Sequence, residues 1–346
     1  MTHNPSHSAI NPPPPPPKIP AAEAQHRVIK AFIEACALQR GEQPSMQLLQ
    51  IWQPFVDLAL QEETTIIELA KSLPTLSPAG ASWASITIGS IIESCGGAER
   101  TVGALTDLLK NWIARLPQWN AEAEEAPELT AGQAEIAACL SRLCQATVAH
   151  LARAEAVRQE LARDSELCQR LRALEVYAHG TRWVHEALIR QSGNLLVLMP
   201  QDKKGLRIRY QNVGNCFHLF SLFQCTVGTS LPGGRAPDPA ITAIAQGEYS
   251  DWGSDDAWWH YGSPTATEPD LLSSIWGEGP VSHIPTIKGE PVMLLWPPIF
   301  ARRSWDTTFY GPPIEAMPPR VVIEQELSEA ECVQWLAELG IPAEAV

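Results

Sequence analysis

The chain has 346 residues, of which 45% are hydrophobic and 18% are charged, a composition typical of folded globular proteins. Its formal net charge is −14, so a nucleic-acid partner is not expected, because phosphate binding requires a concentrated basic surface. No uninterrupted apolar run reaches the roughly 18 to 20 residues that a membrane-spanning helix needs, so no membrane partner is expected either.

Residues 1–20 form a polar, proline-rich leader with six consecutive prolines at positions 12–17. We expect this leader to be disordered, with the proline run in the extended polyproline II conformation. It lacks the basic segment and the apolar core of a secretory signal. The eight cysteines of the chain contain no CxxC pair. Free thiols without a signal predict a reducing, cytoplasmic location.

Residues 21–192 carry apolar side chains at the three-and-four spacing of amphipathic helices. Five short helices are expected first. A single long helix then begins at Thr130, which is a suitable N-cap, and ends at Gly180, and a short helix follows it. The pattern predicts a helical domain that ends in a long helix and that offers a surface for oligomer formation.

Residues 193–346 have a different pattern and form an acidic segment rich in tryptophan. The apolar run Leu195–Met199 and the alternating segment Leu206–Tyr210 predict a β-hairpin. Further strands are expected at Val292–Trp296 and Val321–Glu326, and Ser328 begins a final helix with a capping box. The predicted fold class is therefore an α-helical domain, a bundle of several short helices plus one long helix, followed by a smaller α+β domain with short, mostly antiparallel strands.

A catalytic centre is not evident from residue spacing. Cys216 and His218 are two positions apart, and on a helix they point about 200 degrees away from each other, so they cannot form a nucleophile and base pair. An enzyme would have to assemble its site from distant residues. The candidates for such a site are Cys216, His260, Asp255, Glu278 and His283.

Metal and cofactor sites are not predicted either. The densest group of carboxylates and imidazole comprises Asp251, Asp255, Asp256 and His260, but it lacks the order of a calcium-binding loop. The glycine-bearing segment 228–234 lacks the ending of a phosphate-binding loop. The expectation is no metal and no cofactor.

Tryptophan is the most unusual feature of the second half, because seven of the twelve lie between Trp252 and Trp335. One interpretation is a surface that recognises a protein, since tryptophan and arginine often supply most of the binding energy of interfaces. Alternatively, the indoles bind a small ligand by stacking or fill the core of an irregular domain. The candidate binding residues are Trp305, Arg302, Arg303, Trp258, Trp259 and Trp276.

The leading hypothesis is a non-enzymatic cytoplasmic adaptor, in which the helical domain is a scaffold and the α+β domain binds a protein partner. The first alternative is an enzyme or effector with a Cys, His and Asp site in the second domain. The second alternative is a sensor of a small ligand.

Overall fold

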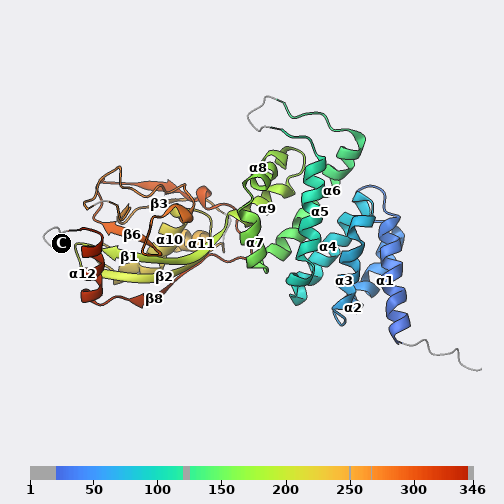
Figure 1. The fold of residues 1–346 in the computed structure, drawn as a ribbon, viewed down its shortest axis with the longest axis horizontal. Coiled ribbons are helices and arrows are strands. Elements are labelled where there is room, and N and C mark those ends of the chain that lie inside the picture. The colour runs from blue at the N-terminus through green and yellow to red at the C-terminus, as the bar shows by residue number, and fades with distance from the viewer. Residues whose placement is uncertain (1–20, 120–124, 249–250, 266, 342–346) are drawn as a thin grey trace, which may run out of the picture.

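The structure is a computed structural model that describes residues 21–119, 125–248, 251–265 and 267–341. The leader predicted for residues 1–20 lies outside these ranges. In Figure 1 a helical part occupies one end of the long axis, and a part built around a β-sheet occupies the other. The α-helices and 3-10 helices (η) of the helical part are α1 (Ala21–Ala37), α2 (Met46–Ala59), α3 (Thr64–Ser72), η1 (Leu73–Thr75), α4 (Pro78–Cys95), η2 (Ala98–Arg100), α5 (Val102–Arg115), α6 (Ala131–Leu151), α7 (Glu155–Ala162), α8 (Ser165–Ala173), η3 (Leu174–Val176) and α9 (Gly180–Ile189).

The helices pack closely because small residues lie where they cross. Gly80 of α4 faces the backbone of α1, and a Cβ atom at this position would lie 2.2 Å from the carbonyl oxygen of Cys36. Gly89 of α4 faces α6, where a Cβ would lie 2.8 Å from Cα of Ala146. The apolar core of this part draws its buried side chains from helices α1 to α9. None of the helices in the described ranges is long and apolar enough to cross a membrane.

The prediction of one continuous helix from Thr130 to Gly180 is wrong, although its N-cap is confirmed. The Thr130 side chain caps α6 in a capping box, but α6 ends at Leu151, and α7 and α8 follow as separate short helices. Two polar side chains stabilise the breaks. Arg158 donates from Nη1 to the carbonyl oxygen of Leu151 at 3.3 Å, and Asp164 accepts from the backbone N–H of Leu167 at 3.0 Å as the N-cap of α8.

The second part is built on a mixed sheet with strand order β4-β6-β1-β2-β8, in which β5 also pairs with β6. Only the β1–β6 pair is parallel among the paired strands of the described ranges. A separate antiparallel pair joins β3 and β7. The elements are β1 (Gln191–Met199), β2 (Lys204–Val213), α10 (Cys216–Val227), η4 (Gly228–Ser230), α11 (Pro239–Ala245), β3 (Ser254–Asp256), β4 (His260–Gly262), η5 (Val281–His283), β5 (Thr286–Ile287), β6 (Glu290–Trp296), β7 (Ser304–Asp306), η6 (Thr307–Tyr310), β8 (Arg320–Glu326) and α12 (Glu329–Glu338).

Helices cover both faces of this sheet, which explains why β1 is apolar without alternation. Leu195 and Val197 belong to the core on the face that α10 covers. Leu196 and Leu198 belong to the core on the opposite face, together with buried side chains of α12. The predicted fold class, a helical bundle followed by an α+β domain with mostly antiparallel strands, is confirmed.

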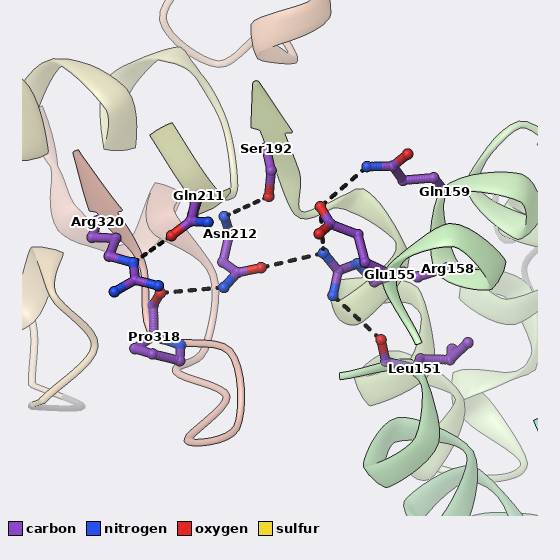
Figure 2. Close-up of polar contacts among 9 residues, drawn as sticks. All are labelled: Leu151, Glu155, Arg158, Gln159, Ser192, Gln211, Asn212, Pro318 and Arg320. Atoms are coloured by element: carbon purple, nitrogen blue, oxygen red, sulfur yellow. Dashed lines mark hydrogen bonds and ion pairs between the residues drawn. The ribbon is translucent and has the colours of Figure 1, made fainter. Parts of the chain in front are cut away.

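The junction between the two parts is short and polar. Helix α9 ends at Ile189 and β1 begins at Gln191, so Arg190 alone connects the last helix to the central strand of the sheet. Across the junction, Arg158 of α7 donates from Nη2 to Oδ1 of Asn212 at 3.3 Å, as Figure 2 shows. Asn212 adopts a positive φ of 54° in β2, and its side chain donates to the carbonyl oxygen of Pro318 at 3.2 Å.

Candidate functional site

The candidate binding tryptophans do not share one environment. Trp258, Trp259 and Trp305 are buried and belong to the core beneath α10, whereas the Trp276 side chain is 70% exposed. The interpretation of tryptophan as a core-filling residue therefore describes these three indoles. Arg302 is exposed and Arg303 is partly buried.

Asp255 lies in a buried network of hydrogen bonds. Pairing of β3 with β7 places Asp255 opposite Trp305. Ser221 of α10 donates to Oδ2 of Asp255 and also contacts the Tyr310 hydroxyl, while the Trp305 indole N–H donates to Oγ of Ser221 at 3.1 Å. Gln224 donates to the same carboxylate oxygen at 3.2 Å. Burial raises the pKa of Asp255, and the network satisfies polar groups inside the core.

Cys216, the candidate nucleophile, is buried at the start of α10. Its Sγ lies 3.8 Å from the carbonyl oxygen of Pro280, and burial raises the thiol pKa to about 12, so the thiolate is disfavoured at neutral pH. Glu278 and His283 are exposed on the neighbouring loop and on η5, respectively. Cys216 contacts the carbonyl oxygen of Pro280, whereas Asp255 accepts a hydrogen bond from Ser221. His260 lies on a different element, β4. No interaction in the described ranges unites the five candidates in one catalytic arrangement.

His218 serves a structural role beside Cys216. Its Nε2 lies 2.7 Å from the carbonyl oxygen of Ala245, to which the neutral ring donates, and its Nδ1 accepts from the N–H of Gly214 at 3.2 Å. Nη1 of Arg190 lies 3.3 Å from the same Nδ1. Protonation would place a hydrogen between Nδ1 and these donors. Burial, followed by the charge of Arg190, lowers the His218 pKa to about 3.

We expect the free energy of unfolding to fall as the pH decreases from about 6.5 toward about 3. In that range the unfolded chain binds a proton at position 218, whereas the folded chain does not, which costs up to about 1.4 kcal/mol per pH unit. Urea unfolding at about pH 7 and pH 5 measures the loss. His218→Gln should reduce the pH dependence, while His26→Gln, at an exposed position in α1, should leave it unchanged. Equal pH dependence in the wild type and His218→Gln would contradict this role.

The structure brings several predicted residues together in a pocket of about 190 Å³, which we call the arginine pocket. It lies between β3, the start of β4 and the loop that connects β6 to β7. The arginine pocket is lined by Arg235, Asp256, Ala257, Trp259, His260, Pro298, Ile299, Phe300, Ala301, Arg302 and Arg303. It therefore contains four of the candidate site residues, namely Trp259, His260, Arg302 and Arg303.

The arginine pocket is positively charged in an otherwise acidic part of the protein. Residues 193–346 contain 9 basic and 18 acidic side chains, and three of the nine basic ones line this pocket. Asp256 is its single carboxylate and pairs with Nε of Arg302 at 3.1 Å. Arg235 and Arg303 form no ion pair with any residue that the structure describes. The pocket is thus left with an excess of positive charge.

Two of the groups that line the pocket are desolvated without an ionic partner. Burial lowers the pKa of the Arg303 guanidinium, because part of the water around its charge is removed. His260 is buried, and its Nε2 has no hydrogen-bond partner among the described residues. Burial, and then the charge of Arg303, lowers the His260 pKa. An anion in the pocket would offset the unpaired charge of Arg303.

Part of this site is not visible in the sequence. Arg302 and Arg303 lie close to Trp305 in the sequence, but Arg235 comes from a distant loop, and no sequence motif includes Phe300. The described ranges contain no group of three or more His, Cys, Asp or Glu side chains arranged to hold a metal ion. Comparison with protein-family models, with curated proteins and with solved structures finds no match.

Proposed function

We propose that this protein is a non-enzymatic, cytoplasmic interaction protein, and that its α+β part binds an acidic segment of a protein partner through the arginine pocket. The observation that carries the proposal is the pair Arg235 and Arg303, two arginines without carboxylate partners among the described residues, beside the imidazole of His260. Arginine binds carboxylates through paired hydrogen bonds, so an acidic side chain is the complementary ligand.

The size and surroundings of the pocket favour a peptide segment. A volume of about 190 Å³ accommodates a single carboxylate-bearing side chain. Phe300 lines the pocket and is 46% exposed. Apolar side chains beside a cationic pocket suit a partner segment with both acidic and apolar residues.

The test measures binding of a fluorescent peptide of about ten residues, rich in glutamate and leucine, to the full chain by anisotropy. We expect Arg303→Gln to weaken binding by about 10- to 100-fold, because a hydrogen bond to a charged group contributes about 1.5–3 kcal/mol. Arg209→Gln is the matched control, since Arg209 is an exposed arginine of β2 that lies outside the pocket. It should bind as the wild type does.

A second peptide separates charge recognition from general apolar binding. In this peptide glutamine replaces every glutamate, so that the length and the leucines are kept. The wild type should bind it at least about tenfold more weakly. The proposal fails if both peptides bind equally, or if Arg303→Gln and Arg209→Gln have the same affinity for the acidic peptide.

A further inference from the structure

A second cavity lies at the junction between the helical part and the α+β part, and we call it the junction cleft. Its volume is about 680 Å³, within the range typical of sites for small molecules. Its lining includes Arg163, Arg172 and His185 from the helical part and Tyr210, Glu278 and Ser282 from the other part. It shares no lining residue with the arginine pocket.

Positive charge dominates the junction cleft. Arg163 and Arg172 form no ion pair with any residue in the described ranges, and Glu278 is the only carboxylate in the cleft lining. Glu175, whose charge also acts on His185, is already paired with Arg182 at 3.6 Å. A third arginine, Arg190, lines the cleft and is buried. The cleft therefore combines several cationic groups with little compensating charge.

The two parts that form the cleft do not share an apolar core. Among the described residues, one hydrophobic cluster draws only on the helical part, and the other two draw only on the α+β part. Polar contacts cross the junction instead. Nη2 of Arg158 in α7 donates to Oδ1 of Asn212 in β2 at 3.3 Å, and Nη2 of the connecting residue Arg190 donates to the carbonyl oxygen of Pro312 at 2.7 Å. A few hydrogen bonds therefore contribute to holding the two parts in this orientation.

The Arg158–Asn212 contact borders the same cleft. Figure 2 shows that Ser192 accepts from the backbone N–H of Asn212, at 3.2 Å, and that Gln159 donates to Glu155, which lies 3.6 Å from Arg158. Ser192 and Gln159 both line the cleft. A ligand that touches either side chain would therefore also affect the hydrogen bonds that connect the two parts.

We propose that the junction cleft binds a small anion that carries at least two negative charges on carboxylate or phosphate groups, and that the bound anion fixes the orientation of the two parts. The anion contacts Arg163 and Arg172 from the helical side and polar groups such as Ser282 from the other side. Binding energy is then shared between the two parts, and an altered orientation loses some of the contacts. This makes the protein a sensor of that anion, independently of the partner that the arginine pocket binds.

Calorimetric titration of the full chain with citrate and with inorganic pyrophosphate, at constant ionic strength, tests the site and distinguishes carboxylate from phosphate ligands. We expect saturable binding of at least one probe. Arg172→Gln and Arg163→Gln should each weaken binding about tenfold or more, since each removes a charge-assisted hydrogen bond. Arg115→Gln, at an exposed arginine that lies outside both pockets, is the control and should bind normally.

Hydrogen exchange of the wild type provides the second measurement. The bound probe should slow exchange in residues 155–163 and 210–214, which meet at the junction. The proposed site is overturned if neither probe binds saturably, or if Arg172→Gln and Arg115→Gln bind the probe equally. Loss of binding in Arg303→Gln but not in Arg172→Gln assigns the anion to the arginine pocket and also overturns the proposed site in the junction cleft. Binding without slower exchange overturns the proposed control of orientation.

Discussion

Replacement of Trp305 by alanine is expected to lower the free energy of unfolding by roughly 3–5 kcal/mol, the range for large aromatic side chains removed from a core. Trp305 is only 4% exposed, and its ring stacks on Phe217 with centroids 5.0 Å apart. Its indole N–H also donates to the Tyr310 hydroxyl at 3.0 Å. The truncation creates a cavity and removes a donor from the buried network around Asp255. Urea unfolding followed by circular dichroism measures the loss.

Trp276 provides the matched control for this experiment. Its side chain is 70% exposed, so Trp276→Ala should change the free energy of unfolding by no more than about 0.5 kcal/mol. The comparison separates the two roles considered for tryptophan in this chain. Similar stability of Trp305→Ala and Trp276→Ala would show that Trp305 is not a core residue and would restore it as a surface residue for binding.

Alanine at Gly80 should destabilise the helical part by about 3 kcal/mol, the upper end of the usual cost of overpacking a core. A Cβ atom there would lie 2.2 Å from the carbonyl oxygen and 2.9 Å from the carbonyl carbon of Cys36. These are backbone atoms, so no side-chain rotation relieves the clash, and α1 and α4 must separate. Helix propensity acts in the opposite direction, because alanine in a helix is favoured over glycine by about 0.5–1 kcal/mol. Thermal unfolding followed by circular dichroism reports the net effect.

Gly103 of α5 is the control for the change at Gly80. No neighbouring side chain or other element lies within 4 Å of the place that a Cβ atom would take there, so Gly103→Ala gains helix propensity without a clash. We expect a small increase in the free energy of unfolding, about 0.5 kcal/mol. A Gly80→Ala protein that is as stable as Gly103→Ala would contradict the close contact between α1 and α4.

Local patterns in the sequence predicted the regular elements well where the signal was itself local. The alternation in Leu206–Tyr210 corresponds to β2 of the observed hairpin, and Ser328 caps α12 in a capping box. The end of the long helix at Leu151 could not be predicted, because no proline or glycine marks it. The break after Leu151 is instead stabilised by Arg158, a residue that is itself held by Asn212 in β2.

The candidate site was accessible to sequence reasoning only in part, for a similar reason. Spacing cannot show which arginines lack a carboxylate, because Arg302 finds its partner Asp256 through the pairing of distant strands, whereas Arg303 finds none in the described ranges. The burial of Trp305 could not be predicted from the sequence either. Its strand has three residues, too few for a repeat that would separate an inward from an outward face.

The single residue between α9 and β1 limits how the two parts can move. Rotation about the φ and ψ bonds of Arg190 is the main freedom that the backbone offers there, since peptide bonds are planar. Rotation of α9 about its own axis should therefore also move β1, because no flexible segment separates the two elements. Reorientation of the two parts should therefore be limited in range, so that the few hydrogen bonds across the junction suffice to select one orientation.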